Sequence, residues 1–530
     1  MTVLKVTTNY FKRHILKLLL IIIIIVLVTI LSLIPAQVLR KTVDDIIPSK
    51  NYQKLLLISI VFCLSYLLIG VVTFIKDIIM LGTSLSITKE LRLIMMKHVE
   101  KIKYNELVKR DSGTLESYFN NDVNAINELF TSGVVNMITD SFKVIGIVIS
   151  IFIYSIRFGF IVLMVLPFLV AFTAFVRKRM LKAQLKTKTL ESGVNKLLLE
   201  NVSNIEQIKI NKATTYASSK YEQVLKSHFK ANQSSNFYDA LFSPVMQIIR
   251  STVICAIILI SGYNANIFGM TIGMIISAIS LITDLFTPIE NLGMEIQTIQ
   301  KSSAAVKRIN EFFQIEERTE TLNQELDGFQ IEFNNVTFAY DKEEVINNFN
   351  LIIKEKDKIA LQGPSGSGKS TIMKLALGLI KPTKGSVKIN GIDNFLLSDT
   401  TRKKDFAIVY QDPFFSGLSI YDEITLLDST ISRDTVRNAL NIVGLDYISN
   451  LDEILKPSSY SSGELQLFNI ARVIVKQPKV IFLDEMNAKI DPVTSEKILS
   501  IINDISRDKT VISINHYGNI LNNAKVIKLS

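Results

Sequence analysis

The sequence predicts a two-part membrane protein, in which an all-α region of six membrane helices precedes an α/β domain. Apolar residues make up 48% of the 530 residues, and their excess lies before residue 290. From Phe329 onward, short apolar runs alternate with helical patterns, which is typical of a largely parallel sheet. We therefore expect a membrane domain at 1–315, a polar linker at 316–328 and an α/β domain at 329–530.

Three uncharged stretches are each near or above the roughly 18 residues that indicate a membrane span: Leu18 to Leu39, Leu55 to Ile75 and Phe158 to Val176. The shorter run Val144 to Ile156 becomes a span only if its helix extends backwards through Lys143 and Asp140. These stretches account for four spans.

The uncharged stretch Ser251 to Thr283 is too long for one span, so we expect two helices with a turn at Gly262 to Asn266. Each helix must then include a bracketing charge, Arg250 or Asp284. A charge inside a membrane is costly unless it is paired or faces water. We expect at least one of the two to line a translocation cavity; alternatively, both lie at helix ends and reach the interface.

The formal net charge of +10 is explained by membrane topology, so no nucleic-acid partner is expected. Basic residues crowd the segments before span one, between spans two and three, and between spans four and five. The positive-inside rule then places both termini and both long loops in the cytoplasm of a multi-pass cell-membrane protein. Basic residues in the first outer loop, such as Arg40 and Lys41, run against the rule. Cys63 and Cys255 both lie in spans, so neither a disulfide framework nor a metal cluster is expected.

The segments between spans carry apolar residues at helical spacing, which predicts that the membrane helices continue as cytoplasmic rods. The rods cover Glu90 to Val108 and Glu191 to Ile210, with tips near Lys103 to Lys109 and Asn211 to Tyr216. Another amphipathic helix, Met294 to Phe313, follows span six.

A phosphate-binding loop of the form GxxxxGK[ST] lies between the strand candidate Lys358 to Leu361 and a helix predicted at Thr371 to Leu379. Its glycines let backbone N–H groups approach an anion, Lys369 supplies a positive charge, and Ser370 can place its hydroxyl on Mg²⁺. The residues predicted to bind ATP here are Gly363, Pro364, Ser365, Gly366, Ser367, Gly368, Lys369, Ser370 and Thr371.

Two carboxylates, Asp484 and Glu485, end the strand candidate Val480 to Leu483, where an open α/β sheet presents its ligand site. We expect Asp484 to hold Mg²⁺ through water and Glu485 to act as the general base for the attacking water. The remaining strand candidates are Ile331 to Phe333, Val387 to Ile389, Phe406 to Tyr410, Val511 to Ile514 and Val526 to Leu529.

Four further features accompany the phosphate loop and the paired carboxylates. Gln411 closes a strand and could sense Mg²⁺ and the attacking water, and His516 could hydrogen-bond the γ-phosphate. Ser461 and Gly463 open a helix predicted at Leu465 to Val475 and could form a second anion site. Tyr340 could stack on adenine. The alternatives are a capped helix for the serine, a surface imidazole for the histidine and a core aromatic for the tyrosine.

Taken together, these features resemble those of an ATP-binding cassette (ABC) exporter of the half-transporter kind, along nearly the full chain. Gly363 to Ser370 matches Walker A and Val480 to Glu485 Walker B, and single residues match the A-, Q-, D- and H-loops: Tyr340, Gln411, Asp491 and His516. The membrane half is similar to that family at Gly113 to Leu115, Asn121 to Ile126 and Ala304 to Ile309.

The resemblance implies export of a peptide or an amphipathic small molecule, driven by ATP with Mg²⁺. Lipid flipping is a related alternative, and an ATP-dependent membrane regulator or immunity protein is another. Membrane lipid and the transported substrate are expected partners. No peptidase-like domain precedes span one, so leader-peptide cleavage is not expected.

The resemblance also implies a dimer, because two cassettes enclose two ATP molecules, each between Walker A of one chain and the signature of the other. The signature departs from the usual LSGGQ, since Tyr460 to Glu464 reads YSSGE. An unscreened Glu464 at about 8 Å from a phosphate would cost on the order of 2 kcal/mol at an effective dielectric near 20. A homodimer is nevertheless favoured over a heterodimer, since the catalytic acid is present.

Overall fold

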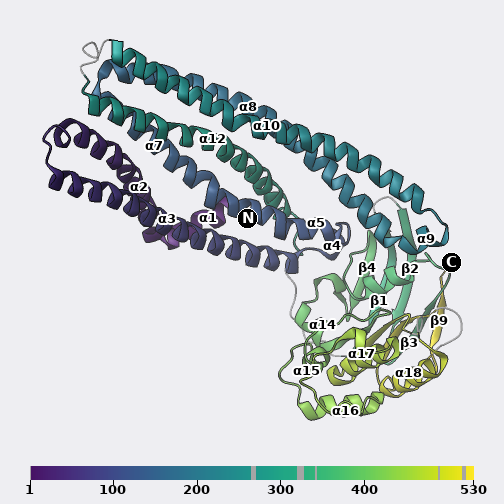
Figure 1. The fold of residues 1–530 in the computed structure, drawn as a ribbon. Helices are drawn as coiled ribbons and strands as arrows, with labels where there is room; N and C mark the ends of the chain where they lie inside the picture. The colour runs from purple at the N-terminus through teal and green to yellow at the C-terminus, as the bar shows by residue number, and fades with distance from the viewer. Residues whose placement is uncertain are drawn as a thin grey trace. The chain divides into compact units, whose positions relative to one another are not determined.

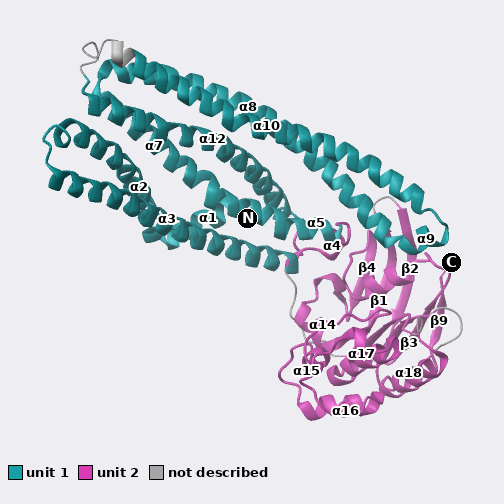
Figure 2. Cartoon of the chain, viewed as in Figure 1, with its two compact units in different colours: residues 1–100, 111–315 teal, residues 101–110, 316–530 magenta. Residues whose placement is uncertain are grey.

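The chain divides into two compact units (Figure 2): unit 1 contains residues 1–100 and 111–315, and unit 2 contains residues 101–110 and 316–530. The computed structural model describes residues 2–263, 270–318, 328–340, 343–486, 490–515 and 521–529.

Unit 1 is built from helices (Figure 1). The α-helices are α1 (Val3–Arg13), α2 (Ile15–Lys41), α3 (Tyr52–Lys101), α5 (Ser112–Ser117), α6 (Val123–Glu128), α7 (Val134–Tyr154), α8 (Ile156–Ser203), α9 (Ile205–Ile210), α10 (Thr214–Tyr263) and α12 (Ile272–Phe312). Short π-helical segments at Thr42–Ile46, Tyr118–Asp122 and Leu129–Gly133 adjoin them.

Among the described residues, 6 helical segments are long and apolar enough to cross a membrane, which agrees with the predicted number. Helix α7 runs back through Lys143 and Asp140 and so completes the third span, as expected. The predicted turn at Gly262 to Asn266 falls largely outside the described residues.

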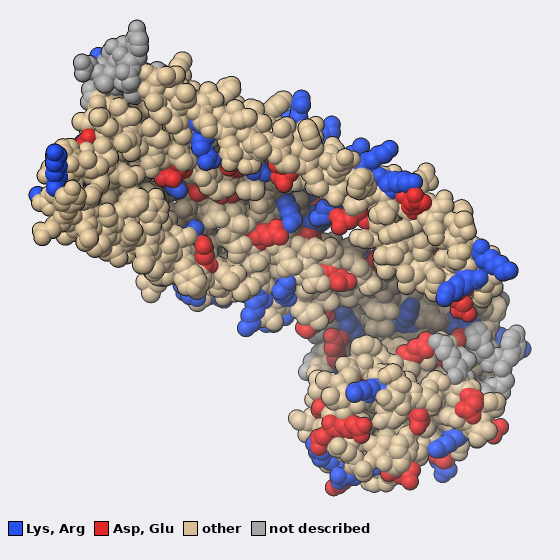
Figure 3. All heavy atoms as spheres, viewed as in Figure 1, with Lys and Arg blue, Asp and Glu red and all other residues tan. Residues whose placement is uncertain are grey.

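The surface of unit 1 is suited to lipid. Large apolar side chains are exposed, including Met164 (84%), Phe168 (65%) and Leu67 (62%). Figure 3 shows a broad uncharged area on the visible face of this unit. Such a surface is stable when lipid covers it.

Three helices of unit 1 far exceed the roughly 20 residues needed to span a bilayer: α3 with 50, α8 with 48 and α10 with 50. They therefore continue as the predicted rods. The second rod ends earlier than expected, because Asn204 Nδ2 donates to Glu200 O at 2.8 Å and ends α8. α9 follows it, and the turn into α10 at residues 211–213 lies within the predicted tip, Asn211 to Tyr216.

Two motifs of the membrane half that lie far apart in the sequence meet in space. Arg308 of α12 donates through Nε to both carboxylate oxygens of Asp122, at 3.1 and 3.0 Å, and Asp122 is 1% exposed. Ser302 Oγ donates to Ala125 O at 2.6 Å. These contacts fasten the segment around α6 to α12.

Unit 2 contains two sheets with helices around them. A four-stranded sheet has the order β2-β1-β4-β5, and a five-stranded parallel sheet has the order β6-β7-β8-β3-β9. The strands are β1 (Ile331–Tyr340), β2 (Glu343–Ile353), β3 (Lys358–Gln362), β4 (Lys384–Ile389), β5 (Ile392–Asp393), β6 (Phe406–Val409), β7 (Val480–Asp484), β8 (Thr510–Ile514) and β9 (Lys525–Lys528).

The helices of unit 2 are α4 (Tyr104–Val108), α13 (Lys369–Ala376), α14 (Asp399–Asp405), α15 (Ile420–Thr425), α16 (Arg433–Val443), α17 (Ser462–Lys476) and α18 (Pro492–Ile505). The parallel sheet divides two apolar cores. One contains Ile372 of α13 and Phe482 of β7, and the other contains Phe468 of α17 and Ile498 of α18.

Helix α4 coincides with the first predicted rod tip, and it folds with unit 2. Arg318 N donates to Lys101 O at 2.7 Å, and Lys103 N donates to Glu316 O at 3.2 Å. The ammonium of Lys374 lies 5.8 Å from the centre of the Tyr104 ring. The segment 101–110 is thus anchored to the unit that carries the phosphate loop.

Candidate nucleotide site

The phosphate loop connects β3 to α13, and its glycines are required by geometry. Gly366 and Gly368 have positive φ angles of 87° and 86°, which residues with a Cβ rarely adopt. A Cβ at Gly363 would lie 2.5 Å from Leu529 O, and one at Gly368 would lie 2.4 Å from Ile346 Cδ1. A side chain at either of these two positions of the loop would therefore collide with a neighbouring part of unit 2.

Lys369 folds back into this loop. Its Nζ donates to Gly363 O and Pro364 O, both at 2.8 Å, and the residue is 6% exposed. Ser367 Oγ is buried and has no hydrogen-bond partner among the described residues. A buried positive charge and an unpartnered hydroxyl fit a polyphosphate, which offers both an acceptor.

The other predicted loop residues occupy different surroundings. Pro364, Ser365 and Ser370 are exposed, and Ser370 lies in the first turn of α13 with its hydroxyl accessible to a ligand. Thr371 is buried in the same helix and packs into the core. Of these side chains, Ser370 alone can offer an exposed hydroxyl from the helix itself.

Asp484 and Glu485 lie at the carboxyl end of the parallel sheet. Asp484 pairs with Ile514 of β8, which pairs in turn with Leu361 of β3, so the acids and the phosphate loop leave the sheet at the same edge. Burial, together with the neighbouring Glu485 charge, raises the pKa of Asp484. A bound cation would relieve this unfavourable charge.

Glu485 has a backbone conformation that its residue type rarely adopts, with φ at 42°. Its N–H donates to Ile514 O at 3.2 Å, which holds the turn after β7 against β8. Strained residues of this kind cluster at functional sites, and the strain supports a functional position for this side chain.

Gln411 lies two residues after β6, at the same edge of the sheet, and is half-buried. Its backbone oxygen accepts a hydrogen bond from Gln466 Nε2 at 2.9 Å, and Tyr410 O accepts another at 2.7 Å. Sequence reasoning missed Gln466, which is 2% exposed on α17. The sequence offered one signal for it: Gln466 is a polar residue between two leucines on an apolar helix face.

A second missed feature fixes the loop that follows Gln411. Arg472 of α17 forms a buried ion pair with Glu423 of α15, with Nη2 and Oε2 2.7 Å apart. Glu423 Oε1 accepts hydrogen bonds from Ser416 N at 2.6 Å and Leu418 N at 3.1 Å. The pair therefore joins two helices to the loop.

The signature segment opens α17 with a capping box. Ser461 Oγ accepts from Glu464 N at 3.2 Å, and Ser461 N donates to Glu464 Oε2 at 2.8 Å. Tyr447 OH donates to Glu464 Oε1 at 2.6 Å. These hydrogen bonds, with that from Tyr447 the largest influence, lower the pKa of Glu464. The glutamate is thus held by neutral donors, a case between the unscreened charge considered from the sequence and a charge screened by a basic residue.

Gly463 is buried, and a Cβ there would lie 2.9 Å from Thr494 Cγ2 of α18. The glycine therefore permits the close approach of two helices. Tyr340, at the end of β1, is 41% exposed and meets the Phe338 ring edge-on at 4.8 Å. Its ring is accessible for stacking, so it is not a core aromatic. His516 lies outside the described residues.

The residues present fit a Mg²⁺–nucleotide. Ser370, Asp484 and Gln411 supply hydroxyl, carboxylate and amide oxygens, which are the ligand types that Mg²⁺ prefers. No group of 3 or more His, Cys, Asp or Glu side chains suited to a metal occurs in the part of the chain that the structure describes. The magnesium would therefore be held jointly with phosphate oxygens, as in other phosphate-loop enzymes.

Family models match both units. The model described as ABC transporter transmembrane region matches residues 18–289, and the model described as ABC transporter matches residues 346–488. The ATP-dependent lipid A-core flippase of Syntrophus aciditrophicus is 25% identical over 500 residues, covering 92% of this chain and 83% of the flippase. The lactococcin-A transport/processing ATP-binding protein LcnC of Lactococcus lactis is 24% identical over 503 residues, covering 92% and 70%.

A solved structure of a bacterial Atm1-family ABC exporter with ATP bound has the same fold. Its TM-score is 0.80 at 19% sequence identity, and the match covers 98% of this chain and 94% of that chain. The similarity therefore extends over both units.

Proposed function

Because the chain belongs to the ABC transporter family, with a transmembrane region and an ATPase domain in one polypeptide, we propose that it is one half of a dimeric exporter of the cell membrane. The observation that carries the proposal is the phosphate loop with its buried Lys369, at the same sheet edge as Asp484 and Glu485. Hydrolysis of ATP would drive substrate movement through unit 1, with both termini in the cytoplasm.

The side chains of unit 2 divide the chemistry between them. Lys369 exchanges its two carbonyl acceptors for phosphate oxygens and neutralises their charge. Glu485 accepts the proton of the attacking water. His516 and Gln411 orient the γ-phosphate and that water. Ser370, Asp484 and Gln411 would hold Mg²⁺, which would supply charge neutralisation on the phosphates.

The signature residues serve the ATP of the second chain. The N-terminus of α17 offers N–H donors to its γ-phosphate, and Ser461 would redirect to that phosphate the hydroxyl that now donates to Glu464 Oε2 at 2.8 Å. Glu464 is held by Tyr447 and by Ser461, so its charge opposes that phosphate less than the predicted 2 kcal/mol. This supports the homodimer over a heterodimer in which this signature is impaired.

The exported substrate is a peptide or an amphipathic small molecule. LcnC is named for lactococcin-A transport, which favours a peptide, and the relative from Syntrophus is named a lipid A-core flippase, which favours lipid flipping as the second candidate. Both names agree with an amphipathic substrate.

The test is to express this chain alone, reconstitute it in lipid and measure ATP hydrolysis and ATP-dependent uptake into inverted vesicles. Brisk, cooperative hydrolysis that Lys369→Ala abolishes would support the homodimer. An inactive chain that a co-expressed second half-transporter rescues would overturn it. Hydrolysis that no ligand stimulates, without any uptake, would instead favour the membrane regulator.

A further inference from the structure

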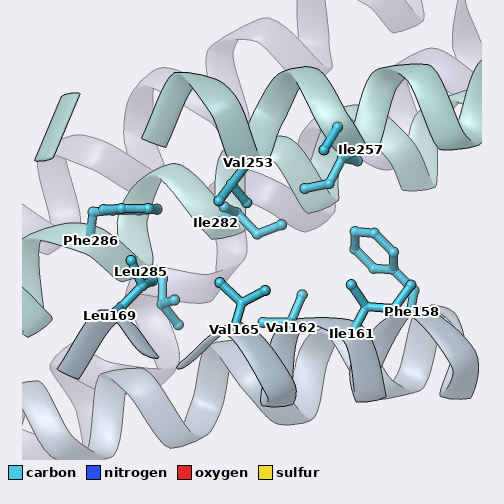
Figure 4. Close-up of a pocket in the computed structure, with 11 residues that line it drawn as sticks. Phe158, Ile161, Val162, Val165, Leu169, Val253, Ile257, Ile282, Leu285 and Phe286 are labelled. Carbon is cyan, nitrogen blue, oxygen red and sulfur yellow. The ribbon is translucent and has the colours of Figure 1, made fainter. Parts of the chain in front are cut away.

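An apolar pocket lies inside unit 1, between α8, α10 and α12 (Figure 4). Side chains of α8, such as Val165, point towards Val253 of α10 and Ile282 of α12. Its free volume is about 100 Å³, and every lining residue is apolar. An engineered apolar cavity of about 150 Å³ stays dry and binds benzene. The pocket therefore suits a group of about the size of an aromatic ring.

One arginine of α10 lies beside this pocket, and a second arginine, from α8, meets it on α12. The guanidinium of Arg250 on α10 lies 5.3 Å from the ring centre of Phe286, which lines the pocket. Arg177 on α8 lies 4.3 Å from the ring centre of Phe242 on α10. Both converge on Glu290 of α12: Arg250 Nη2 is 3.2 Å from its Oε1, and Arg177 Nη2 donates to its backbone oxygen at 3.4 Å.

The arginine pair, Arg177 and Arg250, has N–H donors that could still bind an anion. Glu290 is the one carboxylate in ion-pair contact with either guanidinium among the described residues. Asp239 attracts Arg177 electrostatically, without such a contact. The Nε–H groups of both arginines are buried and have no hydrogen-bond partner in the described part of the chain. An anionic group would satisfy donors that the protein leaves unpaired.

We propose that α8, α10 and α12 form a binding site for an amphipathic organic anion. Its apolar group occupies the pocket, and its carboxylate contacts Arg177 and Arg250. The inference rests on the proposed function, and it narrows the substrate to small molecules or chain ends in which a carboxylate lies beside one apolar group. It also gives a defined ligand to Arg250, which the sequence named together with Asp284 as a candidate for lining a cavity.

The test uses three probes that share one apolar group and differ in charge: 4-(4-fluorophenyl)butyrate, 4-(4-fluorophenyl)butylamine and 4-(4-fluorophenyl)butanol. Binding to the full chain in phosphatidylcholine nanodiscs is measured by ¹⁹F NMR, with protein-free discs as the blank. We expect the anion to bind about tenfold more tightly than the amine or the alcohol, since hydrogen bonds to charged groups are the strong ones.

Matched variants separate the two parts of the site. Arg177→Gln should weaken binding of the anion about tenfold and leave the alcohol unchanged, because Arg177 has no ion-pair partner to strand. Val253→Phe fills the pocket and should weaken all three probes. The controls are Arg179→Gln and Ala171→Phe, which alter exposed side chains of α8 and should change nothing.

Equal binding of the three probes, preference for the amine, no binding of the anion, or an unchanged Arg177→Gln variant would each overturn the proposal. Loss of the anion's binding in discs that contain phosphatidylglycerol would show that a lipid phosphate occupies the arginine pair, and would overturn the assignment to a free organic anion. These measurements need no nucleotide. Brisk ATP hydrolysis without anion preference would therefore reject this inference and leave the proposed function intact.

Discussion

Replacement of Arg472 by methionine tests how unit 2 holds the loop after Gln411. The arginine side chain is 14% exposed and that of its partner Glu423 is 2% exposed. Besides the ion pair, Arg472 donates to Glu423 O at 2.8 Å and to Phe414 O at 2.9 Å, and its guanidinium lies 4.3 Å from the ring centre of Phe415. Methionine keeps the apolar stem and removes all four contacts.

The expected loss of stability is about 3–5 kcal/mol, because removal of one member of a buried pair leaves the other charge uncompensated. The Glu423 carboxylate would keep its two backbone donors, Ser416 N and Leu418 N. Local opening should then become roughly 140- to 3,700-fold more frequent, since each 1.4 kcal/mol is tenfold.

Hydrogen–deuterium exchange of the full chain measures this opening in peptides from α15 and α17. Arg437→Met is the matched control, because Arg437 pairs with Asp434 at the surface, with 54% and 88% of the side chains exposed. Adding Glu423→Gln should recover part of the loss, since it removes the stranded charge. Acceleration of less than about tenfold in Arg472→Met would refute the reasoning.

Two further predictions concern the ends of the nucleotide site. Tyr340→Ala should raise the KM for ATP about three- to tenfold through lost stacking, whereas Tyr340→Phe should not; an unchanged KM in the alanine variant would reject the adenine assignment. Hydrogen bonds to the ionised Glu464 lower its pKa in the folded protein. The stability that they contribute is fully present above the pKa that this carboxyl has in the unfolded chain, and it is lost as the pH falls through the pKa of the folded protein. Tyr447→Phe should therefore move the midpoint of acid unfolding to higher pH, and Tyr216→Phe, exposed in unit 1, should leave it unchanged.

Hydropathy and local motifs were sufficient for the architecture. The six spans follow from uncharged runs, and the parallel sheet follows from compact apolar strands such as β7. β2 was not predicted, because Asn347 and Asn348 interrupt its apolar pattern. In the structure, Asn348 has a positive φ of 46°, which is uncommon for a residue other than glycine. The pairing of β2 with β1 is a tertiary effect that local sequence does not encode.

The residues of the candidate site likewise fall into those that local sequence reveals and those that it does not. The positions of Lys369, Asp484 and Gln411 at the sheet edge could be predicted, because each belongs to a local pattern beside a strand. Gln466 and the pair of Arg472 with Glu423 could not, since their partners lie 49 to 56 residues away in the sequence. The donors that hold Glu464 could not be predicted either, because Tyr447, 17 residues earlier, reaches it only in the folded structure.

The most direct test of the central claim is ATP hydrolysis by the full chain alone in lipid nanodiscs, compared with Glu485→Gln. The account predicts measurable hydrolysis by the wild type. Turnover in the variant should be reduced by about 10²-fold or more, because the general base is lost. The variant should still bind ATP, since Lys369 and the loop backbone are unchanged. Hydrolysis by Glu485→Gln at the wild-type rate would contradict the account.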